Sequence, residues 1–156
     1  MSAVQIKPEE TYFLRHKVLR PHQTINDCKY PGDFDATSFH LGYQTEAVIF
    51  SVASFYKENS PEFTQNNQYR LRGMATEPSK VGQGLGSQLV KEGCRLIKDR
   101  GGDILWFNAR ENAFGFYLKL GFKFHGPYFE IPGIGKHKVM FLTGLINQFP
   151  LAARNG

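Results

Sequence analysis

Three glycines at alternating positions, Gly82, Gly84 and Gly86, mark the segment of this sequence that is best suited to bind a ligand. Glycine lets the backbone approach a ligand closely and present successive N–H groups to it. A helical pattern begins in the same segment, and the positive end of a helix adds to the attraction for an anion. The spacing therefore predicts a phosphate or pyrophosphate site and disfavours a plain connector.

Two common nucleotide loops do not fit this segment. A Walker A loop places Gly-Lys-Ser/Thr at the start of its helix, whereas Gly86 and Ser87 follow each other here without a lysine. A dinucleotide fingerprint has the spacing GxGxxG and an acidic residue that closes the next strand. The chain has GxGxG, and Asp103 precedes the next predicted strand. The sequence therefore lacks required parts of both motifs.

The elements around the loop predict one domain, residues 1–156, of mixed α/β class. With 41% hydrophobic and 21% charged residues, the composition excludes an intrinsically disordered chain. Alternation and apolar runs predict strands, and apolar positions at helical spacing predict helices. The predicted strands are 39–44, 46–56, 68–75, 104–108 and two within 124–145, and the predicted helices are 11–19, 84–100 and 113–120.

Two motifs, in order along the chain, resemble the GNAT superfamily of acyl-CoA-dependent N-acetyltransferases. The run Met-Ala-Thr-Glu-Pro at 74–78 and the run Val-Gly-Gln-Gly-Leu-Gly at 81–86 resemble its pyrophosphate loop and the strand end before it. Val81 departs from the family, which usually has Arg or Gln there, so a charged contact is missing or Lys80 supplies it. The segment 108–122 resembles a second family element through Ala113, Tyr117, Gly121 and Phe122.

The resemblance implies a central mixed, mostly antiparallel sheet with splayed middle strands and helices on both faces. It implies direct transfer of acetyl from acetyl-CoA to a primary amine of a small molecule or peptide, without a metal. The residues that it places against the cofactor are Met74, Thr76, Val81, Gly82, Gln83, Gly84, Leu85, Gly86, Ser87, Asn108 and Tyr117.

Two catalytic roles follow from the same resemblance. The Met74 N–H is expected to donate to the thioester oxygen, and the Thr76 N–H to the pantetheine amide. Gly73 marks a bulge that opens the gap between the two middle strands. Tyr117 is expected to protonate, or donate a hydrogen bond to, the departing thiolate. The alternative for Tyr117 is a core tyrosine whose hydroxyl is satisfied locally.

The acceptor side of the site is less defined by sequence. Arg72 and Arg110 flank the two motifs and favour an acceptor with a carboxylate or phosphate. No carboxylate lies on the strand before the loop, and Glu77 is interpreted as a solvated loop residue. His40 and His137, on predicted strands, are candidate bases or substrate contacts. A base acting through water, or an amine that arrives neutral, stays open.

Charge and cysteine content limit the remaining classes. The formal net charge of +5 suits any polyanion, and coenzyme A is sufficient to explain it. We expect neither nucleic acid nor a membrane as partner, since the basic residues form no tract and no apolar run spans a bilayer. Two distant cysteines and a polar N-terminus predict a cytoplasmic protein with reduced thiols. A non-catalytic acyl-CoA-binding module is the alternative function, and a homodimer is consistent with the superfamily.

Overall fold

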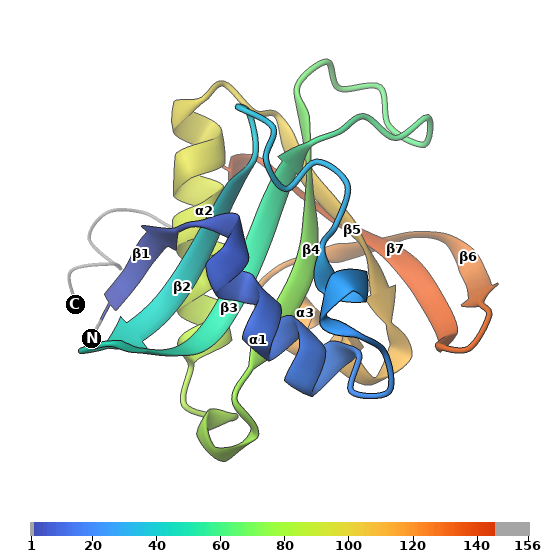
Figure 1. Cartoon of the computed structure of the whole chain (residues 1–156). Helices are drawn as coiled ribbons and strands as arrows, with labels where there is room; N and C mark the ends of the chain where they lie inside the picture. Colours follow the sequence, from blue (N-terminus) through green and yellow to red (C-terminus); the bar gives the residue numbers. More distant parts are fainter. Residues whose placement is uncertain (1, 146–156) are drawn as a thin grey trace.

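Seven strands form one sheet in the order β1-β2-β3-β4-β5-β7-β6 (Figure 1). The computed structural model describes residues 2–145. Every neighbouring pair is antiparallel except β4 and β5, which are parallel. The expected mixed, mostly antiparallel sheet is therefore confirmed. The strands are β1 (Ser2–Ile6), β2 (Phe39–Thr45), β3 (Val48–Lys57), β4 (Gln68–Thr76), β5 (Ile104–Arg110), β6 (Lys123–Ile131) and β7 (Gly135–Thr143).

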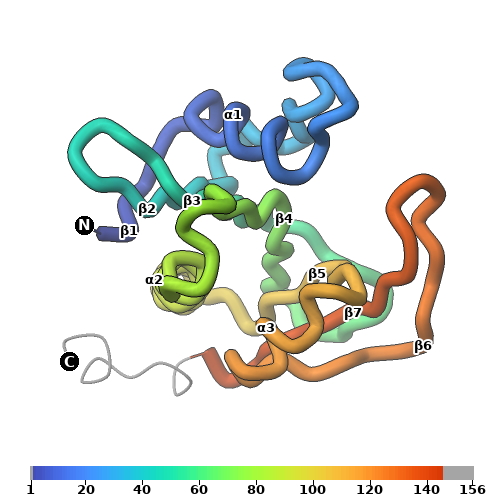
Figure 2. The backbone as a smooth tube through the Cα atoms, turned by 90° about the horizontal axis from the view of Figure 1, so that it is seen from below, coloured from blue at the N-terminus to red at the C-terminus, as the bar shows by residue number. Residues whose placement is uncertain are grey.

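Helices cover both faces of this sheet. Figure 2 shows α1 (Tyr12–Leu14) on one face and α2 (Leu85–Asp99) on the other, with α3 (Phe114–Lys119) on the side of α2. Helix α1 continues as a π-helical turn, η2 (Arg15–Leu19). Short 3₁₀ turns complete the described chain: η1 (Pro8–Thr11), η3 (Ile25–Cys28), η4 (Pro78–Lys80) and η5 (Glu111–Ala113).

Helix α2 packs closely on the sheet. Its buried residues recur at helical spacing, among them Leu89, Cys94 and Ile97, and they join the main core. A Cβ atom at Gly93 would lie 2.2 Å from the ring of Phe55 on β3, so only glycine fits at this position. The close approach fixes the helix, and with it the loop at its start, against the middle of the sheet.

The sheet opens between β4 and β5. These two strands are paired only from Gln68 to Arg70 of β4, and they diverge beyond that point. On its other edge β4 pairs Arg72 and Ala75 with β3 across a register shift, and Gly73 in between has φ +65°. The predicted bulge at Gly73 and the splayed middle strands are both confirmed.

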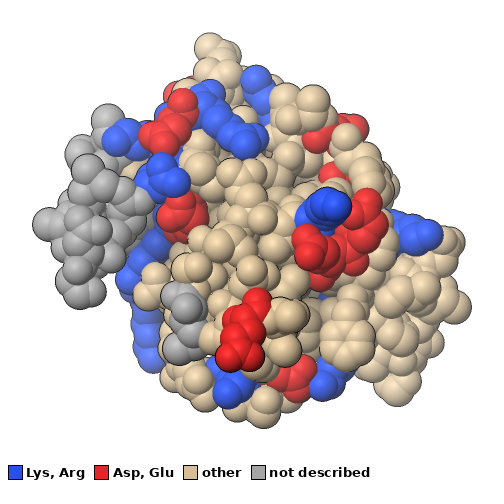
Figure 3. Space-filling model, turned by 60° about the vertical axis from the view of Figure 1, so that its left-hand side comes forward, with Lys and Arg blue, Asp and Glu red and all other residues tan. Residues whose placement is uncertain are grey.

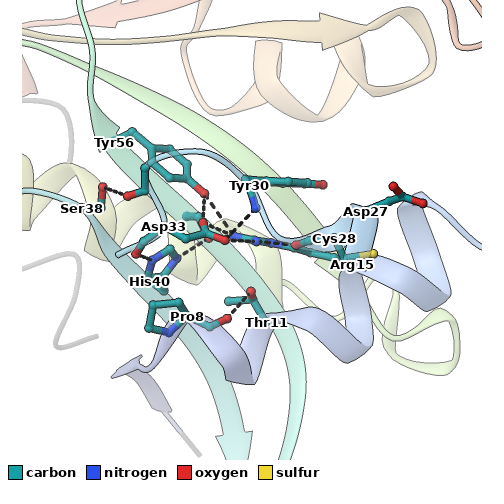
Figure 4. Close-up of polar contacts among 12 residues, drawn as sticks. Pro8, Thr11, Arg15, Asp27, Cys28, Tyr30, Asp33, Ser38, His40 and Tyr56 are labelled. Carbon is teal, nitrogen blue, oxygen red and sulfur yellow. Dashed lines mark hydrogen bonds and ion pairs between the residues drawn. The ribbon is translucent and has the colours of Figure 1, made fainter. Parts of the chain in front are cut away.

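A buried ion pair holds the segment 20–38 against the sheet (Figure 4). The guanidinium of Arg15 donates to the Asp33 carboxylate at 2.8 Å, and both side chains are almost fully buried. Arg15 also donates to three other acceptors, namely Cys28 O at 2.8 Å, Ser54 Oγ at 2.8 Å and Tyr56 Oη at 3.1 Å. The ring of His40 extends the network, because its two nitrogens bond Ser54 Oγ at 2.7 Å and Asp33 O at 2.9 Å. The network joins helix, loop and strands.

Some elements differ from the sequence prediction. The helix predicted at 11–19 is present, but its second half is π-helical. The edge strand β1 was not predicted, because its five residues are half exposed and alternate only weakly. Arg15 has no acidic residue directly beside it in sequence, but in the fold it pairs with Asp33, 18 residues further along the chain.

The described surface carries charges of both signs. The face in Figure 3 carries both acidic and basic side chains among a larger area of other residues. None of the described helices has the length and apolar character that crossing a membrane requires. Among residues 2–145, no three His, Cys, Asp or Glu side chains come together in a metal-holding group.

Candidate active site

The opening of the sheet contains a cavity of about 660 Å³. Its walls come from the end of η2 and the turn after it (18–23), from β4 (70–74) and from the end of β5 (107–110). The β6–β7 hairpin and Tyr117 of α3 close the remaining sides. The cavity therefore brings together residues that are more than 100 positions apart in sequence, at the point where β4 and β5 separate.

The glycine-rich loop lies beside this opening. Gly82 and Gly84 have φ +88° and +81°, and a Cβ atom at either would meet nothing within 4 Å. Gly86 is different, because its Cβ would lie 3.0 Å from the Met74 side chain. The loop therefore exposes its backbone at two glycines and packs against β4 at the third.

The start of α2 leaves donors free in this loop. The first bond at the helix start runs from the Gln88 N–H to the Gly84 carbonyl at 3.1 Å. The N–H groups of Leu85, Gly86 and Ser87 therefore have no acceptor within the helix, and the helix dipole reinforces their attraction for an anion. The Val81 side chain is 68% exposed, so it neither fills nor blocks the loop.

Strand β4 presents an unpaired backbone edge to the opening. Gly73 and Met74 form the bulge against β3, and β5 has already separated from β4 by this point. The Thr76 hydroxyl bonds Ser51 Oγ at 2.8 Å, which fixes the end of the strand to β3. An extended amide chain can therefore lie along this edge and add to the sheet as a strand would.

Tyr117 lines the cavity and belongs to α3, which lies on the same side of the sheet as α2. It is only 6% exposed, and its ring packs against Phe107 at 4.3 Å and Phe122 at 5.7 Å. No hydrogen bond of its hydroxyl is present among the described residues, and the residue lines the cavity. Burial raises the pKa of Tyr117, so the phenol is a proton-carrying donor at neutral pH.

The candidate histidines differ in position. His137 on β7 lines the cavity and lies opposite Arg110 of β5. The Gly135 carbonyl accepts a hydrogen bond from His137 Nδ1 at 2.8 Å. A carbonyl only accepts, so in the neutral ring Nδ1 carries the proton and Nε2 keeps a free lone pair. His40 does not line the cavity, because both of its nitrogens are engaged in the buried network.

The predicted substrate contacts Arg72 and Arg110 line the cavity, as does Asn108, which was predicted as a cofactor contact. The guanidinium of Arg72 lies over the Tyr30 ring, 4.6 Å from its centroid. Glu77 lies outside the cavity and forms an ion pair with Lys17 at 2.7 Å. Lys80 packs over the Phe50 ring at 5.0 Å, and its ammonium has no other described contact.

Two cavity walls were missed by sequence reasoning. The turn 18–23 and Tyr30 line the site, yet they follow a short helix with no motif that marks them. Their place depends on the Arg15–Asp33 pair, which no local pattern indicates. The only sequence signal was the unusually polar segment around Pro31 and Gly32, which is typical of a loop.

An anion-binding loop at a helix start, beside a parallel strand pair that separates over a cavity, defines the class of acyl-CoA-dependent acyltransferases. Comparison with known proteins agrees. Residues 10–140 match the family described as Acetyltransferase (GNAT) domain. The chain is 45% identical over 138 residues to an uncharacterized N-acetyltransferase, YitI, of Bacillus subtilis (strain 168), with 88% of this chain and 93% of that protein covered. The chain therefore belongs to the GNAT acetyltransferase family.

Solved structures show the same fold at low identity. An aminoglycoside 6'-N-acetyltransferase complexed with coenzyme A aligns with a TM-score of 0.71 and 13% identity, covering 92% of this chain and 97% of that one. FeeM, an N-acyl amino acid synthase from uncultured soil microbes, aligns with a TM-score of 0.75 and 10% identity over 99% and 97% of the two chains. At these identities the likeness concerns the fold alone.

Proposed function

We propose that this acyltransferase binds acetyl-CoA between β4 and β5 and transfers the acetyl group directly to a primary amine. The observation that carries the proposal is the continuity of three features: the glycine loop, the bulged edge of β4 and the cavity behind it. A pyrophosphate at the loop and a pantetheine arm along β4 lead a thioester to the cavity, where an amine is able to meet it. Holding the two reactants together supplies much of the catalysis.

In this proposal the loop acts through its backbone. The N–H groups of Leu85, Gly86 and Ser87 hold the pyrophosphate, so the exposed Val81 side chain is not needed for binding. The N–H of Met74 donates to the thioester oxygen as negative charge develops on it. Tyr117, which lines the same cavity as Met74, donates to the departing sulfur.

Binding of acetyl-CoA is the first test. At a ligand concentration of about 100 Kd, acetyl-CoA is expected to raise the Tm by roughly 5–10 °C, because binding at that ratio adds about 2.7 kcal/mol to a chain of this size. NAD, ATP and a short DNA are expected to give much smaller shifts. A matched pair of variants locates the site, namely Gly84→Asp and Gly84→Asn.

Both side chains tolerate the left-handed backbone of Gly84, and a Cβ atom there meets nothing within 4 Å. Gly84→Asp places a negative charge at the loop and is expected to lose the acetyl-CoA shift, whereas Gly84→Asn keeps most of it. Equal shifts of Tm in the two variants would show that the pyrophosphate does not bind at this loop. Release of free thiol with a panel of amines then separates the enzyme from a non-catalytic acyl-CoA-binding module.

His137 is the candidate proton acceptor for the amine. The variant His137→Asn keeps a donor at the place of Nδ1 and removes Nε2. We expect it to lower kcat about tenfold near pH 7, with the acetyl-CoA shift unchanged. The loss is expected to shrink as pH rises, because more of the amine then arrives neutral. An unaltered kcat at pH 7 would leave proton removal to water.

Location and assembly are proposed from weaker observations. Both cysteines, Cys28 and Cys94, are buried and free, as is usual in a reducing compartment, and this supports a cytoplasmic location. Cell fractionation tests it, and recovery outside the cytoplasm contradicts it. A homodimer stays a prediction from the family resemblance, and light scattering decides between dimer and monomer.

A further inference from the structure

The cavity of this protein is lined by arginines and by no carboxylate of the described residues. Arginines enter it from three walls: Arg20 from the turn after η2, Arg70 and Arg72 from β4, and Arg110 from the end of β5. No Asp or Glu lines the cavity in the described part of the chain. A concave site with charge of one sign concentrates ligands of the opposite sign.

Arg72 is the most exceptional of these cations. It is half-buried, stacks on Tyr30, and makes no ion pair or hydrogen bond within residues 2–145. Burial, followed by repulsion from Arg70, lowers the pKa of Arg72. Partial removal of a charge from water is costly, so an anion bound beside Arg72 would offset this cost.

The other inward-facing arginines show that the fold supplies carboxylates where a cation is structural. Arg15 is paired with Asp33, and Arg70 is paired with Glu58 at 2.9 Å while it stacks on Trp106. Arg72 and Arg110 have no such partner in the described structure. Arg20 also lacks a carboxylate partner, since it donates to the Asp27 backbone carbonyl at 2.8 Å. Of the four cavity arginines, Arg70 is therefore the one with a described counter-ion.

The position of Arg72 also suits an acceptor group. It lies two residues before Met74 on β4, with the bulged Gly73 between them, and both residues line the cavity. Its stacking on Tyr30 holds the guanidinium plane in place, and the planar fork of arginine pairs with carboxylate or phosphate oxygens through two parallel N–H bonds. A small molecule is long enough to reach both Arg72 and the acetyl group.

We infer that the acceptor is a small primary amine that also carries a carboxylate or phosphate, held by Arg72 with support from Arg110. This inference rests on the proposed function and adds the substrate class to it. The anion orients the molecule, so its amine is presented to the acetyl group near Met74. Recognition by the fixed fork favours an anion over a hydroxyl or amide of the same size.

Matched pairs of amines test the inference. Each carboxylate-bearing amine is compared with its carboxamide, and phosphoethanolamine with ethanolamine, so that the arms separate carboxylate from phosphate. The wild type is expected to favour one anionic class at least tenfold in kcat/KM. Arg72→Gln is expected to abolish this preference, mainly through KM, and Arg72→Lys to retain part of it. Lys98→Gln, an exposed loss of the same charge on α2, is expected to change nothing.

The outcomes separate this inference from the proposed function. If acetyl-CoA does not bind, the proposed function fails. If amines are acetylated but charged and neutral members react equally, or if the preference survives in Arg72→Gln, the inference fails alone. Should no amine in the panel react, the same pairs are compared by their shift of Tm in the coenzyme A complex. The absence of an Arg72-dependent preference for the anion there also overturns it.

Discussion

Replacing Asp33 with Ala is expected to destabilise the folded chain by about 3–5 kcal/mol, the usual effect of removing one partner from a buried ion pair. Arg15 would keep its charge, with no exposed surface and only neutral acceptors around it. The free energy of unfolding in urea measures the loss. The control is Asp35→Ala, which removes the same charge two residues away at an exposed position and is expected to change the stability by less than about 0.5 kcal/mol.

The same pair predicts how stability depends on pH. Burial alone would raise the pKa of Asp33, but hydrogen bonds from Arg15, Tyr56 and the Tyr30 N–H outweigh it and hold the pKa below its usual range. The unfolded chain takes up this proton near pH ~3.9, so the contribution of the pair is complete above that pH and is lost as pH falls through the folded pKa. In Asp33→Ala, the loss of stability that accompanies protonation of Asp33 is expected to be absent.

His40 adds an earlier step on the acid side. Burial lowers the pKa of His40 below that of an exposed histidine, so the folded chain holds the ring neutral. Stability is complete above about pH 6.5 and falls as pH drops below that value, because only the unfolded chain binds the proton there. Urea unfolding of the wild type at pH 7, 5.5 and 4 is expected to show the His40 step. Measurements extended below about pH 3.9 are expected to show the Asp33 step. A flat profile between pH 7 and 4, or Asp35→Ala as harmful as Asp33→Ala, would contradict this account.

The features that could be predicted from sequence are those with local backbone causes. Three alternating glycines before a helix, and Gly73 in a strand, have few other uses than the loop and the bulge that the structure contains. Tyr117 was placed at the cavity by a different route, the resemblance of the segment 108–122 to the second family element.

The remaining parts depend on contacts between distant residues. His40 and His137 both lie on strands and are indistinguishable by type, yet pairing with β3 places His40 opposite Ser54, and pairing with β5 places His137 opposite Arg110. The partner of Arg15 is equally hidden, because the loop 20–38 folds back over the sheet. Such positions follow from strand order and register, which are properties of the whole sheet.

Tyr117→Phe is expected to lower turnover about 10–100-fold with little change in acetyl-CoA binding, which corresponds to one hydrogen bond of roughly 1.5–3 kcal/mol to a charged group. The ring contacts with Phe107 and Phe122 remain, and the hydroxyl has no described partner to lose, so stability is expected to hold. Free-thiol release measures turnover, and the acetyl-CoA shift of Tm reports binding. Tyr69→Phe, equally buried but outside the cavity, is the control.

The pKa of Tyr117 decides which role this variant tests. A simple thiol has a pKa near ~8.5, and burial raises that of Tyr117 above its ordinary ~10, so complete proton transfer from the phenol to the sulfur is uphill. The phenol therefore stabilises the departing thiolate by donating a hydrogen bond, and the proton that finally reaches sulfur comes from the newly acylated nitrogen. On this account the kcat of the wild type shows no ionisation of Tyr117 between pH 6 and 9, and Tyr117→Phe lowers kcat by the same factor throughout. A loss that varies across this range would instead assign proton transfer to Tyr117.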